Sequence, residues 1–339
     1  MPNLLFRCDA GIAPEIGTGH IFRCLNLANQ LINKKIYKKE EILFLTRNDP
    51  VHLFGKIILK KNKFNFQTIN IKNNNSIEES RHILKCQPSL VIMDRLKTNK
   101  NFIQRIKSKC KVVTFDDYGS GREYCDLAVN AIFSDVEKNK NVLKGYKYLI
   151  LNIKNKSTIK ITNKIKNVFI SFGGYDKRNF LSFVLKNIDL FPKNVKFKII
   201  VSDFLHKNII KKLKVEFNED FINRLSFFKS PKDYSKIFSK CDISICSGGL
   251  TLFESCALGI PTIALPQNMH QYTSIKKLSE KRCVILGSNY LKKDIDFFRS
   301  LLKKLVHDHT MRKVMSSRSK KLIDINGIMR VVNAIKNLK

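Results

Sequence analysis

Short apolar runs recur along the chain, and stretches with helical spacing lie between them. The first run covers residues 4–8, and in residues 20–32 the apolar side chains recur three and four positions apart. This alternation of short buried strands and amphipathic helices is typical of parallel βαβ units. The pattern predicts further strands in the same sheet, at residues 41–46, 89–94, 111–115 and 126–131.

The polar segment 152–158 interrupts this pattern and is predicted to be a linker. The alternation then restarts, with strands predicted at 168–172, 196–201, 242–246 and 262–265 and helices at 178–186, 250–258 and 272–279. After about residue 290 the pattern is helical only. The sequence therefore predicts an α/β protein with two doubly wound Rossmann-like domains, residues 1–158 and residues 159–339, the second with a helical tail.

The composition of the chain indicates the size of the protein, its cellular compartment and the redox state of its cysteines. The chain has 339 residues, 43% of them hydrophobic, which is enough for two cores. No run approaches the roughly 18 apolar residues of a membrane-spanning helix, and Arg7 and Asp9 interrupt the region where a signal peptide would be apolar. Nine cysteines without a CxxC pair favour buried thiols over disulfides or zinc. We expect a soluble, cytoplasmic protein.

The formal charge of +35 follows from 63 Lys and Arg against 28 Asp and Glu. Most of the excess is lysine spread among Asn and Ile, which the base composition of an AT-rich genome would itself produce. The chain has no arginine-rich tract, no RNP-like aromatic pattern and no helix-turn-helix signature. Dedicated nucleic-acid binding is therefore not expected, whereas peripheral association with an anionic membrane is an alternative use of the charge.

Glycines stand between a predicted strand and a predicted helix at three places: Gly17-Thr18-Gly19, Gly173-Gly174 and Ser247-Gly248-Gly249. Glycine lets backbone N–H groups and a helix N-terminus approach an anion closely. One such loop is often only a tight turn, but three at the carboxyl ends of strands point to a diphosphate ligand in a cleft between two sheets. None has the spacing of a P-loop or of a dinucleotide fingerprint.

Four segments carry a resemblance to a known family: residues 8–10 (CDA), 16–24 (IGTGHIFRC), 247–261 (SGGLTLFESCALGIP) and 267–271 (QNMHQ). The first two resemble the UDP-2,4-diacetamido-2,4,6-trideoxy-β-L-altropyranose hydrolases of pseudaminic acid biosynthesis and the related spore-coat polysaccharide glycosyltransferase-like proteins. The third is also similar to the nucleotide-binding segment of the N-acetylglucosaminyltransferase of peptidoglycan synthesis. The resemblance implies the GT-B fold, a UDP-sugar substrate, and no metal or other cofactor.

Two roles are carried over by position. His20 matches the general base that activates water, a task suited to a side chain that titrates near neutral pH; its alternative is a helix-capping histidine. Glu254 matches the carboxylate that accepts hydrogen bonds from the ribose hydroxyls, and its alternative is a favourable acidic residue in a first helical turn.

Asp94 ends a predicted strand and is assigned to catalysis, because it could orient a water, a hydroxyl or His20; capping the next helix is its alternative. The remaining assignments are substrate contacts, made by Gly17, Gly19, Arg23, Asp117, Gly173, Gly174, Ser247, Gly248, Gly249, Thr251, Glu254, His270 and Gln271.

The chain departs from the altropyranose hydrolases directly after Asp94, where Arg95 and Leu96 replace His and Tyr. Residues 115–119 and 126–131 look more like the spore-coat group. We expect a UDP-sugar hydrolase that releases UDP and a free amino sugar for surface polysaccharide synthesis. A GT-B glycosyltransferase with a lipid or glycan acceptor is the alternative, and a binding protein on the same scaffold is a third reading.

Overall fold

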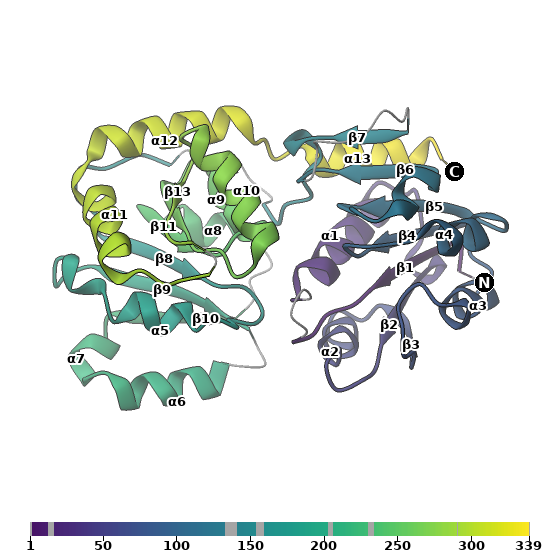
Figure 1. Cartoon of the computed structure of the whole chain (residues 1–339), viewed down its shortest axis with the longest axis horizontal. Coiled ribbons are helices and arrows are strands. Elements are labelled where there is room, and N and C mark those ends of the chain that lie inside the picture. The colour runs from purple at the N-terminus through teal and green to yellow at the C-terminus, as the bar shows by residue number, and fades with distance from the viewer. Residues whose placement is uncertain are drawn as a thin grey trace. The chain divides into compact units, whose positions relative to one another are not determined.

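The computed structural model describes residues 2–12, 17–132, 141–153, 159–202, 206–229, 234–289 and 291–338, except for the side chains of 206–208. The chain divides into two units (Figure 1). Unit 1 comprises Met1–Leu151 together with Asn326–Lys339, and unit 2 comprises Asn152–Ile325.

Unit 1 contains a parallel sheet of seven strands in the order β3-β2-β1-β4-β5-β6-β7. The strands are β1 (Leu4–Cys8), β2 (Ile42–Arg47), β3 (Asn65–Ile69), β4 (Leu90–Asp94), β5 (Lys111–Phe115), β6 (Leu127–Asn130) and β7 (Val142–Lys144). The helices are α1 (Gly19–Asn33), α2 (Phe54–Lys61), α3 (Ile77–Lys85), α4 (Lys100–Lys107) and the C-terminal α13 (Gly327–Lys336). Order and direction are those of a doubly wound sheet.

Both faces of this sheet are buried, which explains why its inner strands are apolar without interruption. On one face Leu5, Val91 and Met93 pack in a cluster with side chains from α3 and α4. On the other face Phe6 stacks on Phe44 with ring centroids 4.8 Å apart. Because successive side chains of a strand point to opposite faces, β1 contributes to both layers.

Unit 2 has a parallel sheet of six strands in the order β10-β9-β8-β11-β12-β13. The strands are β8 (Asn167–Ser171), β9 (Lys196–Val201), β10 (Leu225–Lys229), β11 (Ile243–Cys246), β12 (Thr262–Ala264) and β13 (Ile285–Leu286). The helices are α5 (Phe180–Leu185), α6 (His206–Glu216), α7 (Glu219–Ile222), α8 (Ser235–Phe238), α9 (Leu250–Leu258), α10 (Met269–Glu280), α11 (Ile295–His307) and α12 (His309–Leu322). One apolar cluster joins the sheet to α5, α11 and α12.

The predicted α/β class with two doubly wound sheets is confirmed. The domain boundaries of the structure differ from the predicted ones at both junctions, because unit 2 begins at Asn152 and the last helix belongs to unit 1. Helix α13 packs against α1 of the same unit, so the end of the chain lies with its beginning (Figure 1). Part of the predicted linker, residues 154–158, lies outside the described residues.

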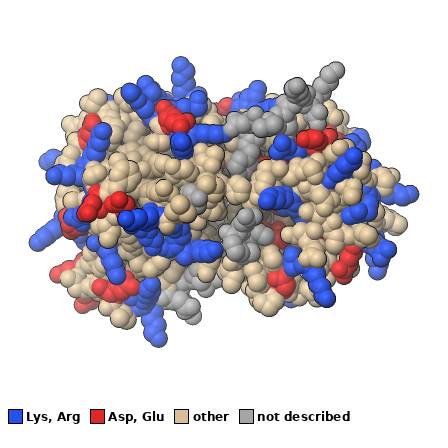
Figure 2. Space-filling model, in the orientation of Figure 1, with Lys and Arg blue, Asp and Glu red and all other residues tan. Residues whose placement is uncertain are grey.

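The state of the cysteines and the distribution of surface charge agree with what the composition predicts. All nine cysteines are free, and eight of them are buried. Figure 2 shows Lys and Arg side chains spread over the visible face of both units. Within the described part of the chain, no helix is both long enough and apolar enough to cross a bilayer.

The docking of α13 on unit 1 can be tested with Ile335→Ala. Ile335 is fully buried, so its truncation should destabilise unit 1 by about 2 to 5 kcal/mol through lost burial and a cavity. Hydrogen exchange followed by mass spectrometry should show faster exchange in α1 and unchanged exchange in β8 and β11. Asn333→Ala removes an exposed side chain of the same helix and should leave both units unchanged. Equal effects of the two variants would contradict this packing.

Candidate functional site

Each sheet has one point where the strand order reverses, and parallel sheets bind ligands at the carboxyl ends of the strands there. In unit 1 this point lies between β1 and β4, and in unit 2 it lies between β8 and β11. Most of the residues predicted for the site follow these four strands or lie in the helices after them, whereas Asp117 follows β5, and His270 and Gln271 lie in α10 after β12. The two groups are described separately, one for each unit.

In unit 1 the structure brings His20 to Asp94. His20 is the second residue of α1, and Asp94 is the last residue of β4. Nδ1 of the imidazole lies 2.6 Å from Oδ1 of the carboxylate. The His20 side chain keeps 16% of its surface exposed, whereas the Asp94 side chain has none. Of the roles that the sequence analysis considers for Asp94, the structure thus shows the contact with His20.

Arg23, one turn further along α1, holds this carboxylate from the other side. Its Nε and Nη2 donate to Oδ2 and Oδ1 of Asp94 at 2.7 and 2.6 Å, and its Nη1 donates to Asp116. The thiol of Cys24 lies 3.5 Å from Oδ2 of Asp94. Arg23 was predicted to contact substrate, but its guanidinium is buried between two carboxylates. Substrate contact by Arg23 stays a prediction.

These contacts determine the charge state of Asp94. Burial alone would raise the pKa of Asp94, but the charges and hydrogen bonds of Arg23 and His20 outweigh it and hold the pKa well below its usual range. The carboxylate is ionised and can only accept hydrogen bonds. The Nδ1 atom of His20 must therefore carry the shared proton, and in the neutral ring Nε2 is left as the acceptor.

The residue beside Arg23 is Asp116, and its neighbour Asp117 is the one to which the sequence analysis assigned a substrate contact. Asp116 has a positive φ of 45°, a conformation that a non-glycine residue adopts only when its surroundings require it. Asp117 is fully buried, accepts from the backbone of Thr98 and Gly119, and holds the loop after β4. Burial raises the pKa of Asp117 to about 6. Its substrate-binding role stays a prediction.

A second buried ion cluster lies behind this edge. Arg95, which departs from the pattern of the altropyranose hydrolases, belongs to it. The guanidinium of Arg95 donates to Glu79 at 2.5 and 3.0 Å, and Arg7 in the middle of β1 donates to the same carboxylate at 2.6 Å. Arg7 also donates to Asp9 at 2.5 Å. The cluster was not predicted, although an arginine inside an apolar strand signals a buried acidic partner.

In unit 2 the two glycine loops follow the neighbouring strands β8 and β11. Gly173 has a φ of 79°, which glycine adopts readily and other residues only rarely, and it is exposed. A Cβ added at Gly173 or at Gly249 would meet no other atom within 4 Å. Gly249 caps the N-terminus of α9, which attracts anions. In unit 1, Gly17 and Gly19 are open in the same way.

Other predicted contacts in unit 2 already have partners. Oε1 of Gln271 accepts from the amides of Gly248 and Gln267, at 3.2 and 3.0 Å, and so fixes the loop before α9. The amide of Ser247 donates to β8, and the hydroxyl of Thr251 bonds to Tyr234. Two further residues, Gly174 and His270, are half-buried. Their contacts with substrate stay predictions.

Glu254 lies in the middle of α9 and is only 3% exposed. Its Oε1 accepts from the backbone amide of Asn152 at 2.9 Å, which ties α9 to the first residue of unit 2. Burial raises the pKa of Glu254 to about 7, against the opposing effect of this one hydrogen bond. The carboxyl group thus has a structural contact, and its binding to ribose stays a prediction.

No known protein family's sequence profile matches the chain. An uncharacterized protein of Methanocaldococcus jannaschii, MJ1062, is 30% identical over 300 residues; the match covers 81% of this chain and 59% of that protein. The chain thus spans less than two thirds of this relative. The spore coat polysaccharide biosynthesis protein SpsG of Bacillus subtilis is 22% identical over 346 residues, which cover 96% of this chain and 95% of SpsG.

A third relative is the UDP-N-acetylglucosamine–N-acetylmuramyl-(pentapeptide) pyrophosphoryl-undecaprenol N-acetylglucosamine transferase of Helicobacter acinonychis. It is 23% identical over 229 residues, which cover 64% of this chain and 63% of that enzyme. Among solved structures, MurG of Acinetobacter baumannii superposes with a TM-score of 0.63 and 14% identity over 99% of this chain and 100% of MurG. The spinosyn rhamnosyltransferase SpnG superposes with a TM-score of 0.65 and 12% identity, over 98% of this chain and 100% of SpnG. The predicted GT-B fold is confirmed.

The buried carboxyl of Glu254 predicts a pH-dependent stability. A group whose pKa is higher in the folded state than its ordinary 4.5 binds more protons when folded, so stability falls as the pH rises from about 4.5 to about 7. Between pH 5 and 8 the free energy of unfolding should fall by about 2 to 3 kcal/mol more in the wild type than in Glu254→Gln. Urea unfolding at both pH values measures this. Glu280→Gln, at an exposed carboxylate, should keep the wild-type slope, and an equal slope in Glu254→Gln would refute the prediction.

Proposed function

We propose that the chain is a glycosyltransferase that uses a nucleoside diphosphate sugar, with UDP as the nucleotide and His20 as the general base. The observation that carries the proposal is the His20–Asp94 pair, clamped by Arg23 at the reversal point of the unit 1 sheet. A base at this edge would lie where a fold of this kind binds the sugar and the acceptor.

The pair has the parts that proton abstraction needs. Asp94 holds the ring by Nδ1 and stabilises the imidazolium that forms, while Nε2 accepts the proton of the attacking hydroxyl. The oxygen of that hydroxyl forms a bond to the anomeric carbon. The bond from this carbon to the diphosphate oxygen breaks, and its electron pair leaves with the diphosphate.

Unit 2 supplies a fitting environment for the leaving group. The open backbone at Gly173 and Gly249 and the N-terminus of α9 can donate to a diphosphate without a side chain in the way. This arrangement would stabilise the charge that develops on the leaving oxygen, and no metal is assigned to that role.

Transfer to an acceptor is favoured because several similar proteins are named as transferases, including the Helicobacter enzyme and the spinosyn rhamnosyltransferase. A UDP-sugar hydrolase that releases a free amino sugar is the second candidate, since the loop around His20 resembles the altropyranose hydrolases and the same pair could activate water. Leu96, where that family has Tyr, leaves the sugar side without the aromatic hydroxyl, and Arg95, where it has His, is paired with Glu79.

We place the reaction in the cytoplasm, as nine free thiols fit a reducing compartment. The lysine excess would support peripheral association with anionic lipid, which a lipid-borne acceptor would require.

His20→Gln tests the base. It should lower turnover of the UDP-sugar by about 10² to 10⁴-fold, because a carboxamide cannot take up the proton. The matched control is His52→Gln: His52 Nδ1 also lies beside a carboxylate, Asp49, at 2.7 Å, and it belongs to the same unit. The control should keep wild-type turnover, measured as UDP release. Full activity of His20→Gln would remove the mechanism.

The choice between transfer and hydrolysis is tested with a panel of UDP-activated amino sugars, incubated with and without membrane extract and followed by mass spectrometry. The proposal expects UDP release to depend on the extract and sugar to appear on an extracted acceptor. Release of free sugar and UDP at the same rate without extract would establish the hydrolase instead.

A further inference from the structure

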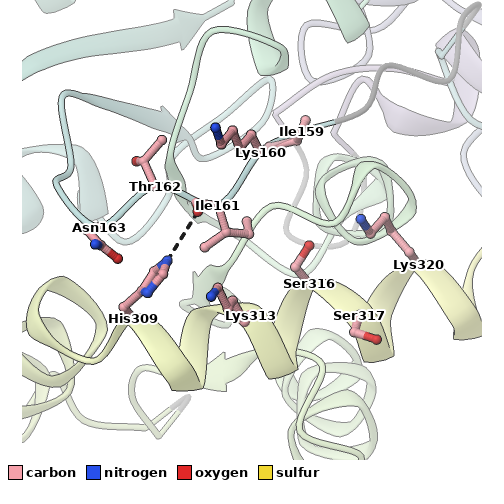
Figure 3. A pocket seen from close by; sticks show the side chains of 10 residues that line it. All are labelled: Ile159, Lys160, Ile161, Thr162, Asn163, His309, Lys313, Ser316, Ser317 and Lys320. Atoms are coloured by element: carbon pink, nitrogen blue, oxygen red, sulfur yellow. Dashed lines mark hydrogen bonds between the residues drawn. The ribbon is translucent and has the colours of Figure 1, made fainter.

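A groove in unit 2 lies between the extended segment Ile159–Asn163 and one face of α12, and it has a volume of about 770 Å³ (Figure 3). The helix contributes His309, Lys313, Ser316, Ser317 and Lys320. These positions are spaced by three or four residues or adjoin such a position, so they share one face of the helix. The residues assigned to the proposed function are not among those that line the groove.

Hydrogen bonds that do not involve its lysines hold the two walls together. The buried Arg312 of α12 donates to the carbonyl oxygens of Thr162 and Asn163, at 2.9 Å each. His309 Nε2 lies 3.2 Å from the carbonyl oxygen of Ile161, the contact drawn in Figure 3. The hydroxyl of Thr162 donates to Asp242 at 2.9 Å. The groove is therefore preformed, and substitution of its lysines leaves these bonds in place.

The charge of the groove is strongly positive. Lys160, Lys313 and Lys320 line it, and no acidic side chain does. Among the residues that the structure describes, none of these three ammonium groups forms an ion pair. The nearby carboxylates have other partners: Asp242 accepts from the backbone of residues 166 and 167, and Asp308 caps α12.

A second observation points into the same groove. The hydroxyl of Ser316 is buried and has no hydrogen-bond partner among the described residues. Buried hydroxyls are normally satisfied, so this one has hydrogen-bonding capacity left for a water or for a ligand in the groove. Gly259, where a Cβ would lie 2.7 Å from the Ser316 hydroxyl and from Lys320 carbons, lets the end of α9 approach this point.

We propose that the groove is a second ligand site, which binds the phosphate groups of a small molecule independently of the function proposed above. Lysine ammonium groups and serine hydroxyls are common donors to phosphate oxygens. The volume is in the range of small-molecule sites, roughly 300–1,000 Å³, and exceeds what a single ion needs. The phosphate can belong to a soluble diphosphate or to the headgroup of a lipid.

The test uses the full chain labelled with ¹³C-histidine, so that His309 reports on the groove and His20 on the other unit. Inorganic diphosphate is titrated at physiological salt. We expect a saturable shift of the His309 resonance. The triple variant Lys160→Gln, Lys313→Gln, Lys320→Gln should weaken this binding about tenfold or more, since three ammonium donors to the phosphate oxygens are lost.

The matched control removes the same charge elsewhere on unit 2, by Lys211→Gln, Lys303→Gln and Lys304→Gln, all exposed and outside the groove. It should bind diphosphate as the wild type does. Ser316→Ala, which keeps every charge, should weaken binding several-fold without loss of fold. Equal loss in both triple variants would show diffuse attraction to a basic protein and overturn the proposal.

Vesicles of phosphatidylcholine, with and without phosphatidic acid, separate the two sources of phosphate. Sedimentation with the phosphatidic acid vesicles that is lost only in the groove variant would identify a lipid headgroup. A shift of His309 with diphosphate alone would identify a soluble ligand. Absence of both responses in the wild type would refute the site.

Discussion

The buried guanidinium of Arg23 is the contact on which the edge of unit 1 depends. It joins α1 to the ends of β4 and β5 through Asp94 and Asp116. Removing such groups from water is costly unless each is paired, so the three side chains hold one another in place. The same arrangement keeps Asp94 ionised and directs His20 so that its second ring nitrogen is left to accept a proton. Packing, charge state and proposed chemistry thus follow from one salt-bridge network.

In unit 2, main-chain groups rather than charged side chains form the edge of the sheet at the carboxyl ends of its strands. The left-handed conformation of Gly173 and the open space at Gly249 leave main-chain donors accessible at neighbouring strands, and Gln271 fixes the second loop. Such donors suit a diphosphate whose charge is delocalised over several oxygens. The groove beside α12 differs from the strand edges of both units, because it combines preformed walls with flexible lysine side chains. The two phosphate sites proposed on unit 2 therefore differ in the groups that would bind the ligand.

The sequence identified the inner strands of both sheets and missed the outer ones. Strands such as β1 and β8 are buried on both faces and read as continuous apolar runs. The strands at the four sheet edges, β3, β7, β10 and β13, carry mostly exposed or half-buried side chains and have no such signal. The sequence also did not decide that α13 packs on unit 1, because an amphipathic helix fits any apolar surface of suitable width.

The sequence by itself determined the α/β class and the position of the glycine loops, since these depend on local pattern and on residue type. Asp94 was a candidate because it ends a predicted strand, and His20 because its loop resembles that of a known family. Only the tertiary structure decided the pairing of His20 with Asp94 across 74 positions, the contact of Asp116 with Arg23, and the burial of Glu254. The reason is physical. Periodicity states which residues are buried, whereas hydrogen bonds and ion pairs between distant segments depend on where the folded backbone places each side chain.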